Sequence, residues 1–165
     1  MKPNPQEQSL LPDKEKLGRL MEEVLSLLKQ LIETPSLSRE ENFTADLIQK
    51  FLEAKGIKTI RKLNNVWATN KHFSKDKPTI LLNSHHDTVK PNSGYTLDPF
   101  KAIEKDGKLY GLGSNDAGGP LMGLLASFLY FYDKPAAYNF IYAATAEEEI
   151  SGKNGVECVL PELGK

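Results

Sequence analysis

The chain has 165 residues, which suits one compact domain by the rule of roughly 100–200 residues per domain. Its 21 Lys and Arg residues and 22 Asp and Glu residues give a formal net charge of −1. The chain therefore lacks the overall positive field that attracts nucleic acid or an acidic membrane surface, and we expect neither as a partner.

A single cysteine, Cys158, excludes an intramolecular disulfide and favours a reducing compartment. Residues 1–13 lack the basic start and apolar stretch of a signal peptide. No later segment reaches the roughly 18–20 uninterrupted apolar residues that a transmembrane helix needs. These features predict a soluble, cytoplasmic protein.

The first half of the chain begins with two predicted helices. Apolar residues recur at helical spacing over residues 17–32, and Pro35 interrupts this pattern. A second helix is expected with Ser38 as its capping residue and an apolar face over residues 43–52. Gly56 is expected to end this helix in a left-handed conformation.

Short strands follow the two helices. We predict strands at residues 58–62, 65–70 and 78–84, the last of them apolar on both faces, as a central strand between helices would be. Alternating residues around Asp106-Gly107 predict a hairpin over residues 101–111.

The last third of the chain returns to longer apolar elements. A largely buried helix is expected at residues 119–132, a buried strand at 138–145 and a further helix within 152–160. The alternation of helices with buried strands predicts an α/β fold, a three-layer sandwich on a mostly parallel or mixed sheet. Ligands of such sheets bind beyond the carboxyl ends of the strands.

The first polar cluster is Ser84-His85-His86-Asp87, directly after a predicted strand. Residues two apart on an extended chain point the same way, so His85 and Asp87 share a side and His86 faces the other. A metal-binding imidazole usually donates its second N–H to a carboxylate, and His85 with Asp87 would form such a pair. The alternative is a polar strand end with solvated histidines.

The second cluster is the glycine-rich segment 111–119, which leads into the predicted apolar helix. It lacks the Gly-Lys-Ser/Thr ending of a phosphate loop and the spacing of a dinucleotide site. Its charged residue, Asp116, is suited either to capping the helix or to binding a cation.

The third cluster is Glu147-Glu148-Glu149, after the predicted strand 138–145. Three adjacent carboxylates at the end of a buried strand repel one another unless a cation offsets their charge. The alternative is a solvated acidic patch. His85, Asp116 and the glutamates together offer the ligand types that zinc accepts.

Three segments resemble the signatures of the M20 metallopeptidases. Residues 81–91 resemble an apolar strand leading to His-x-Asp, residues 110–119 a Gly-x-Gly-x-x-Asp segment, and residues 144–149 a Thr-x-[Asp/Glu]-Glu-Glu segment. Order and spacing match over roughly residues 15–165. Within the family the likeness is strongest to acetylornithine deacetylases and related succinyl-amino-acid hydrolases.

The resemblance implies a role for each residue. His85 would bind one zinc, with Asp87 as its orienting partner, and Glu149 would bind the second zinc. Asp116, followed by a cis peptide bond to Ala117, would bridge the two ions. Glu148 is the general base. The implied cofactor is zinc, two ions per complete active site, with cobalt as a substitute.

The implied reaction is hydrolysis of the amide bond of an N-acyl amino acid, of the acetylornithine deacetylase type in arginine biosynthesis, and the implied partner is a small-molecule substrate. The sequence departs from many relatives at Leu112 and Gly118, where they carry Arg and Lys.

The family also needs a further acidic ligand, a distant His ligand and a dimerisation domain, so residues 1–165 are expected to form the N-terminal portion of the catalytic domain of a homodimeric protein. The chain alone is then expected to bind zinc weakly and to lack turnover.

Two other functions compete with this interpretation. The chain would alternatively be a non-catalytic α/β binding or scaffold module that keeps the fold, although the presence of Glu148 favours an enzyme because such a module needs no base. Phosphate or nucleotide binding through residues 111–119 is the third hypothesis.

Overall fold

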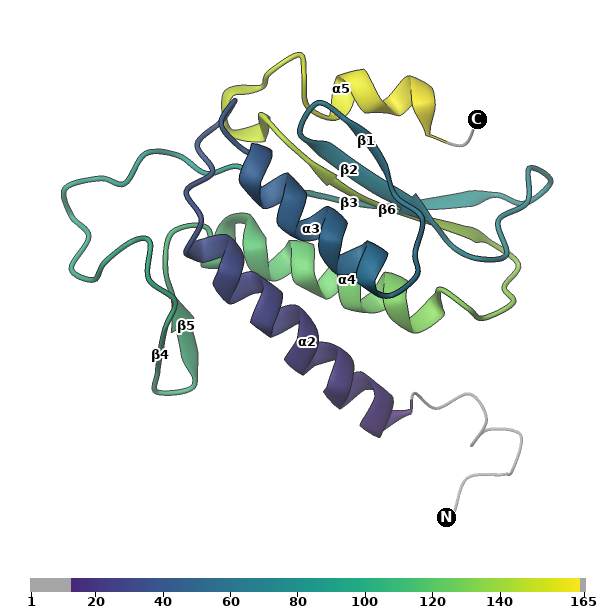
Figure 1. Cartoon of the computed structure of the whole chain (residues 1–165), viewed down its shortest axis with the longest axis horizontal. Helices are drawn as coiled ribbons and strands as arrows, with labels where there is room; N and C mark the ends of the chain where they lie inside the picture. Colours follow the sequence, from purple (N-terminus) through teal and green to yellow (C-terminus); the bar gives the residue numbers. More distant parts are fainter. Residues whose placement is uncertain (1–12, 164–165) are drawn as a thin grey trace.

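A mixed β-sheet forms the centre of the computed structural model, which describes residues 13–163 (Figure 1). Its strand order within these residues is β1-β2-β6-β3. The bounds are Ile60–Lys62 for β1, Asn65–Thr69 for β2, Thr79–His85 for β3 and Asn139–Thr145 for β6. β2 pairs antiparallel with β1 and β6, whereas β3 pairs parallel with β6. The predicted mixed α/β sheet is therefore confirmed.

Helices cover both faces of the sheet, which makes three layers (Figure 1). α3 (Asn42–Ala54) and α4 (Gly119–Phe131) pack on one face, and α2 (Lys14–Ile32) packs against both of them. The short α5 (Val156–Val159) lies on the opposite face.

Side chains of the inner strands alternate between these two layers, as the period of two in a strand requires. The side chains that pack with the three long helices are Val66, Ala68, Tyr142 and Ala144. Those that pack with Val159 of α5 are Trp67, Ile141 and Ala143. Both faces of β2 and β6 are thus buried, which explains their continuous apolar sequences.

β3 differs from its predicted central position. Within the described residues it is an edge strand that pairs with β6 alone. Ile80 is 39% exposed and Leu81 36% exposed because no strand adjoins their free side. The strand becomes buried only toward its end, at His85. The prediction of a central strand was therefore wrong for this chain. An apolar sequence shows that a strand can be buried, but it does not show how many strands pair with it.

The observed helices differ from the predicted ones mainly at their starts and ends. α2 and α4 are confirmed, and Gly56 ends α3 with a φ of 72° as expected. The capping role of Ser38 was wrong, because α3 begins at Asn42, after Glu41. The last helix is shorter than predicted: α5 has four residues and a 3-10 turn follows it at Leu160–Glu162.

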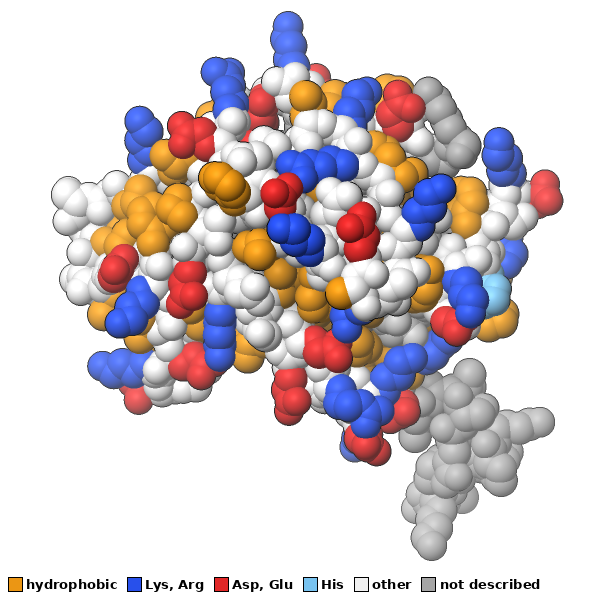
Figure 2. Space-filling model, viewed as in Figure 1, with side chains coloured by type: hydrophobic (Ala, Val, Ile, Leu, Met, Phe, Trp, Pro, Cys, Tyr) orange, Lys and Arg blue, Asp and Glu red, His pale blue; other side chains and the backbone are white. Residues whose placement is uncertain are grey.

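The predicted hairpin is present as β4 (Ile103–Lys105) and β5 (Lys108–Tyr110). Its turn residues Asp106 and Gly107 both have positive φ, as a tight two-residue turn requires. Acidic and basic side chains are interspersed over the face shown in Figure 2, in keeping with the net charge of −1. Within residues 13–163 no helix is long and apolar enough to cross a membrane. The expectation about a signal peptide concerns residues 1–13, of which only Asp13 is described.

The packing of α2 gives a stability prediction. Leu27 is 2% exposed and belongs to the main core, whereas Leu25 on the same helix is 38% exposed. We expect Leu27→Ala to lower the free energy of unfolding by roughly 2–5 kcal/mol because it leaves a cavity. The matched change Leu25→Ala is expected to cost about 1 kcal/mol or less. Urea denaturation measures both, and equal losses would contradict this assignment of the core.

Candidate metal centre

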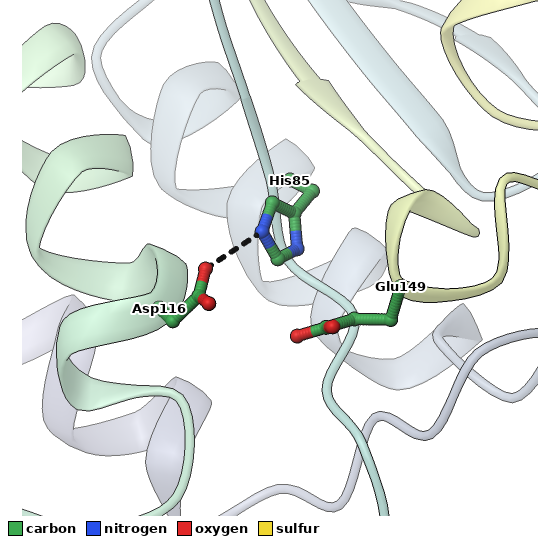
Figure 3. A group of neighbouring side chains, drawn as sticks. All are labelled: His85, Asp116 and Glu149. Carbon is green, nitrogen blue, oxygen red and sulfur yellow. Dashed lines mark hydrogen bonds and ion pairs between the residues drawn. The ribbon is translucent and has the colours of Figure 1, made fainter.

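The three predicted metal ligands lie together at one edge of the sheet. One ligand atom from each of His85, Asp116 and Glu149 lies within 4.8 Å of the other two (Figure 3). His85 ends β3, Asp116 belongs to the irregular turn Ser114–Gly118 before α4, and Glu149 lies in the 3-10 turn Glu148–Ile150 after β6.

Strand pairing explains this convergence. β3 and β6 run parallel in a register that sets His85 beside Thr145, so both strands end level with each other. The residues that follow β6 therefore come to the same edge as His85, as expected for the carboxyl ends of parallel strands. The predicted meeting of the three clusters follows from this single parallel pair and from the turn before α4.

Asp87 is a buried carboxylate behind His85. It accepts hydrogen bonds from the Ser38 hydroxyl at 2.7 Å and from the backbone N–H groups of Glu148 and Glu149 at 3.1 Å each. Its Oδ1 lies 3.3 Å from Nδ1 of His85. Burial alone would raise the pKa of Asp87, but His85, Ser38 and the two amides lower it to about 2. The carboxylate is therefore ionised at neutral pH.

His85 presents its two ring nitrogens to different groups. Nδ1 lies 3.1 Å from the Asp87 carbonyl oxygen, and Nε2 lies 3.2 Å from Oδ1 of Asp116 and 3.5 Å from Oε2 of Glu148. Burial favours the neutral ring, but hydrogen bonding to Asp87 and the charges of Asp87 and Glu148 raise the pKa of His85 to about 9. Because Nδ1 points at Asp87, Nε2 is the nitrogen that faces the acidic groups.

The acidic groups around Nε2 suit a divalent cation. The side chain of Asp116 is 78% exposed and that of Glu148 59%, so both reach the open side of the site. Burial and the charges of Asp116, Asp87 and Glu148 raise the pKa of Glu149, while His85 lowers it. A bound cation would favour the ionised form of Glu149 and offset this repulsion.

The donor set also fits zinc in type and spacing. Imidazole nitrogen and carboxylate oxygen are both zinc ligands. Two ligand atoms that bind one zinc at roughly 2.0–2.2 Å lie at most about 4.4 Å apart. The observed limit of 4.8 Å is only slightly larger, so small side-chain rotations would bring the three groups to bonding distance.

His86 points away from this group, as the alternation along the strand predicted. It is buried, and its Nε2 lies 2.9 Å from the carbonyl oxygen of Asn64, which can only accept a hydrogen bond. Nε2 therefore carries a proton, and Nδ1 lies 2.9 Å from the Thr44 hydroxyl, which donates to the Glu41 carbonyl oxygen at 3.0 Å. Burial lowers the pKa of His86. Since His85 and His86 are both buried, the alternative of two solvated histidines is wrong.

The three glutamates after β6 have separate environments. Glu147 is buried and accepts a hydrogen bond from the side chain of Asn154 at 2.9 Å. Glu148 and Glu149 lie beside His85. The alternative of a uniform solvated acidic patch therefore does not describe this segment.

The glycine-rich turn is fitted closely against α2. The Asp116–Ala117 peptide is cis, in agreement with the resemblance. A Cβ atom on Gly118 would lie 2.5 Å from the Gly113 carbonyl oxygen and 2.5 Å from a methyl group of Leu28. Leu112 is buried. The two departures from relatives thus occupy packing positions outside the candidate ligand set.

Sequence reasoning missed two residues that organise the site. Ser38 was assigned to a helix cap and instead donates to Asp87, 49 positions along the chain. Glu41 is fully buried and accepts a hydrogen bond from the backbone of Glu147, 106 positions away. Neither contact leaves a local signal, because both join segments that meet only in the folded chain.

A comparison with protein families places these features in a known context. Residues 81–163 match the model of peptidase family M20/M25/M40, and this segment contains all three candidate ligands. The chain belongs to this family. The family resemblance found in the sequence is thereby confirmed.

Curated relatives agree with the family match. The chain is 31% identical over 145 residues to the succinyl-diaminopimelate desuccinylase of Rickettsia bellii, covering 81% of this chain and 36% of that protein. It is 29% identical over 151 residues to the enzyme of the same name from Coxiella burnetii, covering 87% and 40%. The chain thus spans well under half the length of these relatives.

Solved structures show the same fold. An M20 family metallo-carboxypeptidase from Sulfolobus solfataricus aligns with a TM-score of 0.67 and 25% identity over 86% of this chain and 34% of that chain. Human carnosine dipeptidase 1 aligns with a TM-score of 0.70 and 20% identity, covering 90% and 38%. The Bacillus subtilis YXEP protein, described as a dinuclear metal binding peptidase, aligns with a TM-score of 0.61 and 24% identity, covering 90% and 40%.

The hydrogen bond from Ser38 to Asp87 gives a testable prediction. Ser38→Ala is expected to lower the free energy of unfolding by roughly 1.5–3 kcal/mol at pH 7, because it removes a donor to a buried charged group. Ser26→Ala, on the exposed side of α2, is the control and is expected to change it by about 0.5 kcal/mol or less.

The same variant has a predicted pH dependence. The pKa of Asp87 lies below its ordinary value of 3.8, so its ionised form stabilises the fold above about pH 4, and this contribution is lost as the pH falls toward 2. Ser38→Ala raises that pKa and should move acid unfolding to higher pH. Acid titration monitored by circular dichroism measures the midpoint, and an unchanged midpoint would count against the contact.

Proposed function

We propose that this chain contributes to a two-zinc active site that hydrolyses the amide bond of an N-acyl amino acid. The observation that carries the proposal is the convergence of His85, Asp116 and Glu149 with buried Asp87 behind the imidazole. His85 would hold one ion, Glu149 would hold the other, and Asp116 would contribute to both. Asp87 orients His85 and keeps Nε2 directed at the metal.

Glu148 is the general base in this proposal. When bound, zinc lowers the pKa of a coordinated water toward about 7 and polarises the substrate carbonyl. Glu148 would take a proton from the attacking water as the water oxygen bonds to the carbonyl carbon, and would pass it to the amine that leaves as the C–N bond breaks. Its carboxylate reaches within 3.5 Å of Nε2 of His85, and its backbone N–H is held by Asp87, so the base is placed beside the ligand group.

The cavity beside the candidate ligands suits a small-molecule substrate. It has a volume of about 390 Å³ and is lined by Thr88, Val89, Tyr95, the turn at 111–116 and Glu149. This volume lies in the range of roughly 300–1,000 Å³ that is usual for such ligands. The sequence resembles both acetylornithine deacetylases and succinyl-amino-acid hydrolases and does not identify the acyl group, and the two curated relatives named above are desuccinylases, so the proposal covers N-acetyl and N-succinyl amino acids.

We further propose that residues 1–165 form the N-terminal portion of the catalytic domain of a longer, homodimeric protein. The curated relatives are more than twice as long as the part that aligns. The edge of β3 that is unpaired within residues 13–163, with its exposed Ile80 and Leu81, supports the proposal because a longer chain would cover it. The remaining zinc ligands would come from the additional residues of that longer protein.

Zinc binding by the 165-residue chain is the first test. Each ion would have one ligand of its own and a share of Asp116, whereas catalytic zinc usually has three protein ligands. Calorimetric titration with Zn²⁺ should therefore show weak binding, and His85→Ala should abolish binding of the ion that His85 holds. His72→Ala, at an imidazole beside Asp133, is the control and should leave the binding at this site unchanged. Two tight sites, or turnover by this chain alone, would contradict the proposal.

Activity of the longer protein is the second test. With N-acetyl and N-succinyl amino acids as substrates, Glu148→Gln is expected to lower kcat about 10²- to 10⁴-fold while the zinc content stays constant. Glu157→Gln, at an exposed position on α5, is the matched control. A zinc-loaded protein that hydrolyses none of these substrates would instead favour a non-catalytic binding module.

A further inference from the structure

A second fully buried carboxylate, Glu41, lies behind the turn that carries Glu148 and Glu149. Its Oε1 accepts hydrogen bonds from the backbone N–H groups of Arg39 at 2.7 Å and Glu147 at 3.1 Å. Its Oε2 accepts from the side-chain amide of Asn64 at 2.8 Å. All three donors are neutral. Burying a carboxylate costs free energy unless its oxygens accept hydrogen bonds. The buried position of Glu41 therefore depends on these three donors.

Glu41 and Asp87 together hold three consecutive backbone amides. The N–H of Glu147 donates to Glu41, and those of Glu148 and Glu149 donate to the two oxygens of Asp87. The two carboxylates reach the turn from different parts of the chain, one just before α3 and one after β3. The turn is thus fixed from two sides.

Core packing does not fix this turn by itself. None of the residues of the turn Glu148–Ile150 is buried. Glu147, at its start, has a φ of 54°, a conformation that most side chains avoid and that persists only where the surroundings enforce it. Hydrogen bonds from the three amides therefore help to fix the position of the turn.

Glu41 is also connected to the strand that carries His85. The Asn64 side chain donates to Glu41, and the Asn64 carbonyl oxygen faces Nε2 of His86, next to His85. The same buried carboxylate is thereby linked to the ends of both β6 and β3. A change at Glu41 would alter the position of one candidate ligand relative to the other.

We propose that Glu41 is a positioning residue that sets the placement of Glu148 and Glu149 relative to His85 and Asp116. The inference rests on the proposed function, because it assigns Glu41 a role toward that same site. Glu41 acts through the Glu147 amide and through Asn64, and it does not bind the metal itself.

The variant Glu41→Gln tests the inference with almost no change in shape. Its NH₂ group must face either the Asn64 side-chain donor or the amides of Arg39 and Glu147, so at least one donor opposes another donor. We expect the amides of residues 147–149 to exchange hydrogen at least about 10-fold faster, while those of the β2–β6 ladder are unchanged. Zn²⁺ affinity should fall about 10- to 100-fold. Both are measured on the 165-residue chain, by nuclear magnetic resonance and by competition with a chelating dye.

Two further variants separate positioning from general stability. Glu40→Gln, at the exposed neighbour, makes the same chemical change and should leave amide exchange and Zn²⁺ affinity unaltered. The double variant Glu41→Gln/Asn64→Asp restores all three hydrogen bonds, because the glutamine NH₂ donates to the new carboxylate and its oxygen accepts from both amides. It should recover amide protection and Zn²⁺ affinity, which a loss of general stability would not predict.

The outcomes distinguish this inference from the proposed function. Unchanged exchange at residues 147–149 in Glu41→Gln, or no recovery in the double variant, would overturn the role of Glu41. If Glu41→Gln does not fold, Asn64→Ala removes one donor and should speed the same exchange, and its failure to do so would also overturn the role. If amide exchange in Glu41→Gln changes as expected but the chain does not bind zinc at all, the result would instead overturn the proposed metal site.

Discussion

Asp87 has no exposed surface, yet its pKa is held near 2 by the groups that surround it. The Ser38 hydroxyl, the ring of His85 and two backbone amides all face its two oxygens. These contacts join three segments: the loop before α3, the end of β3 and the turn after β6. Most other features of the candidate site follow from this ionised, buried carboxylate, because it fixes the imidazole and the acidic turn relative to each other.

The sheet brings these segments to the same place. A parallel pair ends both of its strands at one edge, and the register of β3 with β6 sets His85 level with Thr145. The glycine-rich turn reaches this edge because glycine at position 118 lets it approach α2 and Gly113 closely. The acidic groups then surround Nε2 of His85 on the open side, while Asp87 and Glu41 hold the backbone from the buried side. The candidate site thus combines a fixed inner layer, which includes buried His85, with acidic groups that are partly or largely exposed.

Local patterns in the sequence predicted the features that depend on neighbouring residues. The apolar stripe of α2, the turn at Asp106-Gly107 and the alternation that separates His85 from His86 were all found correctly. The three candidate ligands were identified because each follows a recognisable strand or turn signal. Their roles as ligands remain predictions, as do those of Asp87 and Glu148.

Features that depend on distant contacts were missed or wrong. Ser38 resembles a helix cap in sequence, but its hydroxyl donates a hydrogen bond to a buried carboxylate 49 positions away. The apolar sequence of β3 suggested a central strand, whereas its neighbours within the described residues place it at an edge. The importance of Glu41 depends on a partner 106 positions away, which no local pattern indicates.

The most direct test of the whole account is to locate zinc in crystals of this chain grown with Zn²⁺, by anomalous diffraction at the zinc absorption edge. We expect density for one ion within roughly 2.0–2.2 Å of Nε2 of His85 and a carboxylate oxygen of Asp116, and for a second ion at the same distance from carboxylate oxygens of Asp116 and Glu149. Zinc found only at other positions, such as beside His72, with these three side chains left apart, would contradict it.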